Sequence, residues 1–297
     1  MNKQKVLVLG ATGFVGSHIF EDLNITFETF GSTRKLNSNI QIQFDITDEN
    51  TWSSIIEIDP TVIINCIGYG VVKNELDIKQ MIDINYLQSV KLFEFIFNKL
   101  PNTFLIHIGT AFEYSLNQTK LTEDSICCPQ TYYGISKLMA SNFLLSNKEF
   151  VKYTILRPFS MFGPYEHESK IIPYLINAQK NKQAIPLSSG MQQRDYFFVK
   201  DLSNFIKTII NKPHSSIPNL LNIGSGKTHS LIDLGEIISS QLPDFIEDFW
   251  QWGKAPTRVG ESDAFYNASD LAICNGFEIS PINEGLKQTI NYYLKNV

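Results

Sequence analysis

The stretch of residues 5–23 reads KVLVLGATGFVGSHIFEDL and joins a short apolar run, a glycine-rich turn and the start of a helical pattern. Gly10, Gly13 and Gly16 follow the apolar run at intervals of three residues. Glycine tolerates positive φ and lets the backbone approach a ligand closely. A helix that begins near Gly13 points its free N–H groups and the positive end of its dipole at an anion. The stretch therefore predicts a diphosphate-binding turn of the kind that holds a dinucleotide.

Short β-branched runs alternate with helical patterns along the chain. We expect strands at residues 5–9, 26–30, 40–44, 61–65, 103–108, 152–156 and 220–223. We expect helices at residues 80–98 and 131–146, after Asp201 and near residues 231–242. This alternation predicts an α/β protein whose parallel sheet carries helices on both faces. Continuous apolar runs such as VIIN fit strands that are buried on both sides.

The pattern of strands and helices divides the chain into two parts. Residues 1–160 predict a Rossmann-type, doubly wound parallel sheet that binds the dinucleotide, completed by segments within about 196–225. Residues 161–195 and 226–297 predict a smaller, mixed C-terminal lobe that binds the substrate. Ligands of open α/β sheets bind at the carboxyl ends of the strands, so we expect the cleft between the two parts to lie there.

Composition excludes several classes of protein. The 297 residues include 25 basic and 30 acidic side chains, and a net charge of −5 argues against a protein that coats nucleic acid. No run approaches 18 apolar residues, so we expect no membrane span. None of the four cysteines forms a C-x-x-C pair and the five histidines do not cluster. We therefore predict a cytoplasmic protein without a metal site.

The end of the second expected strand normally selects the cofactor. An acidic residue there binds the ribose 2′-hydroxyl of NAD, whereas an arginine accommodates the 2′-phosphate of NADP. Ser32 and Arg34 follow this strand, while Glu28 lies two residues too early unless the register slips. We predict NADP(H) rather than NAD(H), with Arg34 pairing with the phosphate. Asp45, after the third strand, is placed to accept from the adenine amino group.

Tyr133 and Lys137 lie one helical turn apart at the start of an expected helix, so they share one face. An ammonium close to a phenol favours the phenolate, and we expect it to lower the pKa of Tyr133. Thr110 follows the expected strand at residues 103–108, where its hydroxyl can hydrogen-bond a substrate carbonyl. These three residues are the predicted catalytic set.

The glycine spacing with Thr110, Tyr133 and Lys137 resembles the extended short-chain dehydrogenase/reductase family, the group of nucleotide-sugar epimerases, dehydratases and reductases. The segments NCIG, LRPFSMFGP, RDYFFVKDL and LNIGSG resemble later landmarks of the family in the same order. The resemblance and the turn together give the expected cofactor-binding residues: Gly10, Thr12, Gly13, Phe14, Val15, Gly16, Ser32, Arg34, Asp45, Ile46, Cys66, Ile67, Gly68, Asn85, Tyr133, Lys137 and Pro158.

The resemblance also implies roles. NADPH would deliver hydride to a carbonyl carbon, Tyr133 would protonate the developing alkoxide, Lys137 would bind the nicotinamide ribose, and Thr110 would orient the carbonyl. A nucleotide-diphosphate sugar would be the substrate, held by Arg194 and Arg258 and contacted by Ser160, which replaces an asparagine common in the epimerases.

The sequence leaves more than one type of reaction possible. Ala111 and Phe112 stand where the 4,6-dehydratases carry Asp-Glu, with Glu113 one place later, so 4,6-dehydration is disfavoured. The leading hypothesis is an NADPH-dependent reductase of a nucleotide-linked 4-keto-6-deoxyhexose, in the manner of enzymes that make deoxysugars for bacterial surface glycans such as the O-antigen. The alternatives are a 4-epimerase with bound NAD and a non-catalytic dinucleotide-binding regulator. The family also implies a homodimer.

Overall fold

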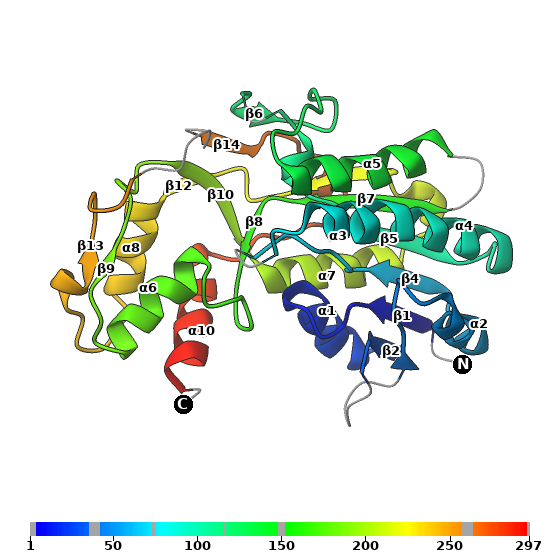
Figure 1. The fold of residues 1–297 in the computed structure, drawn as a ribbon, viewed down its shortest axis with the longest axis horizontal. Helices are drawn as coiled ribbons and strands as arrows, with labels where there is room; N and C mark the ends of the chain where they lie inside the picture. Colours follow the sequence, from blue (N-terminus) through cyan, green and yellow to red (C-terminus); the bar gives the residue numbers. More distant parts are fainter. Residues whose placement is uncertain are drawn as a thin grey trace.

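A seven-stranded sheet dominates the molecule (Figure 1). The computed structural model describes residues 4–35, 42–72, 75–115, 117–147, 152–256 and 264–295. In chain order the strands are β1 (Lys5–Leu9), β2 (Glu28–Thr33), β3 (Ile42–Gln43), β4 (Val62–Asn65), β5 (Phe104–Ile108), β7 (Tyr153–Pro158) and β11 (Leu220–Ile223). They lie in the order β11-β7-β5-β4-β1-β2-β3, and every neighbouring pair is parallel. The predicted Rossmann-type sheet is therefore confirmed.

Helices cover both faces of this sheet. One face carries α1 (Phe14–Asn24) and α7 (Val199–Ile210), and the other carries α2 (Ser53–Ile58), α4 (Ser89–Lys99) and α5 (Tyr132–Ser146). Side chains of a strand alternate between the two faces. Val6 and Val8 accordingly pack with α1 and α7, whereas Leu7 and Leu9 pack with the other helices. The chain reverses its direction of winding between β1 and β4, and the carboxyl ends of these two strands meet at Gly10 and Cys66.

The helix expected at residues 80–98 is interrupted. It consists of α3 (Ile78–Ile82), a π-helical segment η2 (Asp83–Gln88) and α4, which continues from it. A π segment inserts one residue into a turn and often marks a functional site. Here it lies around the buried Asn85.

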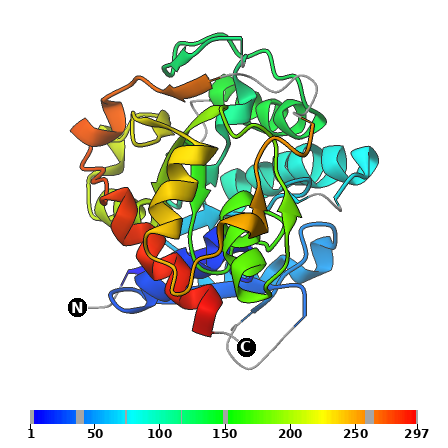
Figure 2. The ribbon, with the colours of Figure 1, turned by 90° about the vertical axis from the view of Figure 1, so that its left-hand side faces the viewer.

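A smaller lobe holds a second, mixed sheet. Its strands are β6 (Lys120–Leu121), β8 (Ser160–Phe162), β10 (Gln193–Phe198), β12 (Thr228–Ser230) and β14 (Ala264–Asn267). They run β12-β10-β14-β6, with β8 also paired to β10. The strands β9 (Ile185–Pro186) and β13 (Trp250–Gln251) form a separate pair. A third apolar core joins these strands to α6 (Ile171–Lys180), α8 (Leu231–Ser239) and α10 (Ile282–Lys295). Figure 2 places α8 and α10 on the near side of this lobe.

The shorter elements complete the described chain. They are η1 (Glu49–Thr51), η3 (Ala111–Glu113), η4 (His214–Ser216), η5 (Glu247–Phe249) and α9 (Leu271–Cys274). None of the helices within the described ranges has the length and apolar character that crossing a bilayer needs.

One strand differs from its prediction in a way that matters for the cofactor. We expected the second strand at residues 26–30, but β2 runs from Glu28 to Thr33. The N–H groups of Thr26 and Phe27 both bond to the carbonyl of Leu23, so these two residues close the end of α1 instead. The third strand was expected at residues 40–44, of which 40 and 41 lie outside the described residues.

Candidate active site

The turn after β1 has the geometry that the glycine spacing predicts. Gly10 has a φ of +78°, and its carbonyl accepts the N–H of Gly13 at 3.0 Å. A Cβ added to Gly16 would lie 2.2 Å from the carbonyl oxygen of Gly10. Gly16 therefore lets α1 begin directly against the turn, with its first N–H groups at the carboxyl end of β1.

The turn leaves room for a ligand. A Cβ on Gly13 would meet no atom nearer than 3.4 Å, and one on Gly68 none nearer than 3.7 Å, so neither glycine is hemmed in by the protein. Thr12 and Gly13 are exposed, and Phe14 and Val15 are half-buried at the start of α1. The residues present thus fit a dinucleotide whose diphosphate lies on the N-terminus of α1.

The end of β2 carries no acidic residue. Ser32 and Thr33 are its last two residues and Arg34, which is exposed, follows directly. The hydroxyl oxygen of Ser32 accepts the N–H of Gly10 at 3.1 Å, which joins β2 to the glycine turn. Glu28 is paired with Lys5 at the opposite, amino end of the sheet. The register slip that would have made Glu28 a ribose ligand is therefore excluded.

The two residues expected beside the adenine follow β3. Asp45 is half-buried, and its Oδ1 accepts the N–H and the hydroxyl of Thr47 at 2.9 and 2.8 Å. Ile46 is buried in the core below it. Local hydrogen bonds thus hold the Asp45 carboxylate in place after the strand.

The segment after β4 is tied to the helices beside it. Asn85 accepts the N–H of Tyr69 and donates to its carbonyl, both at 2.8 Å, and donates to the hydroxyl of Ser136 at 3.0 Å. Asn65, the last residue of β4, accepts the N–H of Ile67 at 3.1 Å. Asn85 therefore links η2, α5 and the loop that contains Cys66, Ile67 and Gly68.

The predicted catalytic residues come together at the carboxyl ends of β4 and β5. Thr110 caps the short helix η3, and its side chain hydrogen-bonds that of Tyr133 in the first turn of α5. Thr131 caps α5 and accepts the N–H of Gly134 at 3.0 Å. A Cβ on Gly134 would lie 2.2 Å from the carbonyl of Phe112, so glycine allows α5 to approach η3 closely.

The two titratable residues of this set are perturbed by burial. Burial lowers the pKa of Lys137 to about 8, against the charges of Glu113 and Cys66. Burial also raises the pKa of the Cys66 thiol to about 12. We expected Lys137 to lower the pKa of Tyr133, and this is wrong for the protein without ligand. Desolvation raises the pKa of Tyr133, the charge of Glu113 adds to this, and the hydrogen bond from Thr110 opposes it.

One of the two arginines predicted to hold the substrate packs on an aromatic cluster beside the catalytic loop. Arg194, on β10, is buried, and its guanidinium lies 4.7 Å from the ring centre of Phe265. Phe265 contacts Phe112, two residues after Thr110, at 5.8 Å, and it contacts Phe159 at 6.1 Å. Arg194 thus lies where the two sheets meet.

The remaining predicted site residues lie on β8, at the end of β7 and outside the described residues. Ser160 is half-buried on β8 opposite Tyr196, and Pro158 ends β7 opposite Ile223. Arg258 lies outside the described residues. Among the residues that the structure describes, no three His, Cys, Asp or Glu side chains are grouped to hold a metal ion.

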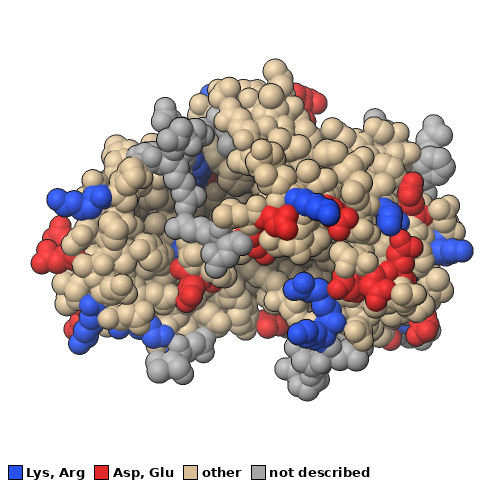
Figure 3. Space-filling view, viewed as in Figure 1, with Lys and Arg blue, Asp and Glu red and all other residues tan. Residues whose placement is uncertain are grey.

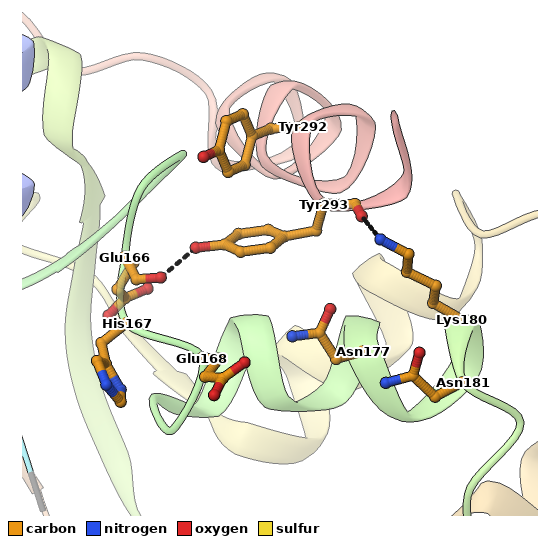
Figure 4. Close-up of a pocket in the computed structure, with 8 residues that line it drawn as sticks. All are labelled: Glu166, His167, Glu168, Asn177, Lys180, Asn181, Tyr292 and Tyr293. Atoms are coloured by element: carbon orange, nitrogen blue, oxygen red, sulfur yellow. Dashed lines mark hydrogen bonds between the residues drawn. The ribbon is translucent and has the colours of Figure 1, made fainter. Parts of the chain in front are cut away.

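The face of Figure 3 is hollowed between the two lobes. Two further hollows lie elsewhere. One, of about 490 Å³, lies between α6, α10 and the loop before α6, and includes Glu166, Lys180 and Tyr293 (Figure 4). The other, of about 270 Å³, includes Trp52 and Lys91. Neither hollow is lined by a predicted catalytic residue. The candidate active site is therefore assigned from Thr110, Tyr133 and Lys137 at the carboxyl ends of the strands.

Sequence reasoning missed two carboxylates that order the site. Glu75 accepts the N–H groups of Gly70 and Val71 at 2.8 and 2.9 Å, which fixes the loop after β4. Asp195, beside Arg194, is fully buried and accepts the N–H groups of Ser225, Gly226 and Asn267 at 2.7 to 3.0 Å. Asp195 lies in the segment RDYFFVKDL, and Ser225 and Gly226 lie at the end of the segment LNIGSG. Both segments were recognised in the sequence, but no pattern indicated that the Asp195 carboxylate binds the backbone of the second segment.

The fold, the glycine turn and the Thr110, Tyr133 and Lys137 set define a nicotinamide-dependent enzyme of the oxidoreductase type. The model of the NAD dependent epimerase/dehydratase family matches residues 6–224. The chain therefore belongs to this family.

Relatives agree with this assignment. A putative UDP-glucose 4-epimerase of Methanocaldococcus jannaschii is 26% identical, over 98% of this chain and 99% of its own. A GDP-6-deoxy-D-talose 4-dehydrogenase of Aggregatibacter actinomycetemcomitans is 24% identical, over 79% of each chain. The solved UDP-N-acetylglucosamine 4-epimerase of Methanobrevibacter ruminantium, in complex with UDP-N-acetylmuramic acid, has a TM-score of 0.86 and 23% identity over 100% of both chains, which shows the same fold.

Proposed function

We propose that the protein is an NADPH-dependent reductase of a nucleotide-diphosphate 4-keto-6-deoxyhexose, in deoxysugar synthesis for surface glycans. The observation that carries the proposal is that Thr110 at the end of β5 lies beside Tyr133, with Lys137 one turn further along α5. A positioned phenol can donate its proton to a carbonyl oxygen that accepts hydride. Reduction needs this direction of transfer, whereas the first step of an epimerase needs a base.

The residues of the chain divide the reaction between them. Bound NADPH supplies the reducing equivalent for the C4 carbon. Tyr133 donates a proton to the C4 oxygen, so that the carbonyl becomes a secondary alcohol. Thr110 donates a hydrogen bond to the same oxygen and orients it. Lys137 places its positive charge beside the site, where it would stabilise the phenolate that remains after the proton transfer.

The residues at the end of β2 favour NADPH over NADH as the cofactor. Arg34 follows this strand directly, and Glu28 is at its other end. A guanidinium pairs well with a 2′-phosphate. The diphosphate of the sugar nucleotide has a candidate partner in Arg194, which packs on Phe265, a ring that also contacts Phe112.

Elimination of water is disfavoured by the residues after Thr110. Ala111 and Phe112 cannot act as acid or base, and both carboxylate oxygens of Glu113 accept hydrogen bonds inside the protein. The name of the Aggregatibacter relative describes dehydrogenation at position 4 of a nucleotide-linked 6-deoxy sugar, which is the reverse of the proposed reduction. A 4-epimerase is the second candidate, because the relative from Methanocaldococcus matches nearly the whole chain and carries that name.

One assay separates these functions. The protein is mixed with NADPH or NADH and with CDP-, dTDP-, UDP- or GDP-linked 4-keto-6-deoxyhexoses, and the absorbance of the reduced nicotinamide is followed. We expect a steady fall with NADPH, about ten-fold faster than with NADH. Interconversion of UDP-glucose and UDP-galactose without net oxidation would instead establish the epimerase. Dinucleotide binding with neither reaction would establish the regulator.

A further inference from the structure

The catalytic loop contains a buried carboxylate to which the proposed reaction gives no role. Glu113 ends η3, three residues after Thr110, and its side chain is completely buried. Its Oε1 accepts the backbone N–H of Thr110 at 2.9 Å, and its Oε2 accepts from Nε of Arg157 at 2.8 Å. One carboxylate thus connects the end of β5 to β7.

The surrounding residues hold this ion pair rigidly. A Cβ on Gly109 would lie 2.6 Å from Oε1 of Glu113, so glycine provides the space for the carboxylate. The Arg157 guanidinium lies 4.6 Å from the ring centre of Tyr114, whose hydroxyl donates to Asn222 at 2.7 Å. Burial alone would lower the pKa of Arg157, but the charge of Glu113 raises it above its usual value. The Arg157 guanidinium therefore keeps its charge beside the Glu113 carboxylate.

The carboxylate fixes the direction of the Thr110 hydroxyl. The Thr110 oxygen accepts the N–H of Phe112 at 3.3 Å while Glu113 holds the N–H of Thr110, so the two ends of η3 cap each other. The bond from Phe112 fixes the position of the Thr110 oxygen. The hydroxyl hydrogen is not used by this bond and can be donated to a group in the site. The side chain that it meets there is Tyr133.

The same negative charge acts on Tyr133 and Lys137 of α5. It opposes the effect of burial on the pKa of Lys137 and adds to the effect of burial on the pKa of Tyr133. The charges and titratable groups that face these residues come from several elements. Cys66 and His107 face Lys137, and Glu75 faces Tyr133. Arg157 and Cys127 lie beside Glu113, and Tyr114 packs on Arg157.

We propose that Glu113 is a positioning residue, which aims the Thr110 hydroxyl at the reacting oxygen and sets a fixed negative charge beside Tyr133 and Lys137. Its effect on turnover rests on the proposed reduction, but its effect on Lys137 does not. Glu113 thereby acts through its neighbours and touches neither substrate nor cofactor.

The test uses Glu113→Gln, which keeps an oxygen for the N–H of Thr110 and removes the charge. NMR of protein carrying ¹³C at lysine Cε follows the titration of Lys137, identified by the signal that Lys137→Met lacks. We expect the titration midpoint of Lys137 to fall by about one pH unit. Because this readout needs no substrate, it stays decisive if no keto sugar is reduced. An unchanged midpoint in folded Glu113→Gln overturns the proposal.

Loss of one partner leaves the Arg157 guanidinium buried and unpaired, which is strongly destabilising. The double variant Glu113→Gln with Arg157→Met removes both charges, so we expect a smaller fall in the Lys137 midpoint, because loss of the guanidinium offsets part of the effect of losing the carboxylate. Glu123→Gln is the matched control, because Glu123 accepts the N–H of Asn222 at 2.7 Å behind the pair. It should leave the midpoint unchanged, and an equal shift in the control overturns the assignment to Glu113.

Turnover gives a second readout if the reductase assay succeeds. We expect kcat of the double variant to fall about ten-fold with little change in KM, because Thr110 is misaligned. The alkaline limb of the kcat profile should move to lower pH with the midpoint of Lys137. A fall in kcat with no movement of that limb would show a merely structural role and would overturn the charge part of the proposal.

Discussion

The side-chain amide of Asn85 donates a 3.0 Å hydrogen bond to the hydroxyl of Ser136, so the π-helical segment is fastened to the helix that carries Tyr133 and Lys137. Asn85 also exchanges two hydrogen bonds with the backbone of Tyr69. The buried amide of Asn85 therefore connects η2, α5 and the loop after β4.

Asn85→Ala should lower the free energy of unfolding by about 1–3 kcal/mol, because it removes the partner of the half-buried Tyr69 N–H and the buried bond to Ser136. Chemical denaturation measures this change. Asn98→Ala is the control, since Asn98 is exposed on α4, and it should change stability by less than about 0.5 kcal/mol. Equal effects of the two substitutions would contradict a structural role for the Asn85 amide.

Tyr133→Phe should lower kcat by about a hundred- to ten-thousand-fold, because the proton donor is lost. The affinity for the dinucleotide should change little, which fluorescence titration can measure. Tyr132→Phe is the matched control, because Tyr132 is 57% exposed at the preceding position. Retention of full activity by the Tyr133 variant would remove this phenol from the reaction.

Arg34→Ala should weaken NADPH binding about ten-fold and leave NADH binding unchanged, because only NADPH has the phosphate that a guanidinium would pair with. Isothermal titration with each dinucleotide measures the difference. Lys35→Ala, a change of the next exposed cation, serves as the control. The same loss for both dinucleotides would argue that Arg34 does not select the cofactor.

Glu166, in the hollow of Figure 4, makes stability depend on pH. Burial raises its pKa from 4.5 to about 8, against the charge of Lys170. The folded protein therefore keeps a proton that the unfolded chain has lost, and this contribution to stability falls as the pH rises through that range. Glu166→Gln should leave stability unchanged below about pH 4 and raise it by about 2 kcal/mol above about pH 8.

Denaturation curves at the two pH values measure this difference. Glu168→Gln removes an exposed carboxylate from the same hollow and should have no such pH-dependent effect. A Glu166 variant with the same stability as the original protein at alkaline pH would show that this carboxyl ionises freely in the folded state.

The sequence predicted the large sheet well, because buried parallel strands and glycine turns depend on local chemistry. Residues 5–9 and 220–223 form strands with the expected bounds. The second strand was misplaced, because nothing local shows that Thr26 and Phe27 bond back to Leu23. The direction of the Tyr133 pKa shift was also wrong, since desolvation depends on how deeply the tertiary structure buries the phenol.

Spacing and the family resemblance predicted the residues that the structure brings together at the candidate site, but not the residues that support them. Glu113 and Arg157 are 44 residues apart, and only the pairing of β5 with β7 brings them together. The expected homodimer stays a prediction, with Leu87 and Ile135 exposed on η2 and α5.

The smaller sheet pairs β6, at residues 120–121, with β14, at residues 264–267, while β11 returns to the edge of the large sheet after β10 has left it. The path of the chain therefore crosses between the lobes several times, and neither lobe is one continuous piece of polypeptide. A single splice point cannot exchange a complete lobe with that of a relative. An exchange of the smaller lobe would instead need several splice points, one at each crossing of the chain between the two sheets.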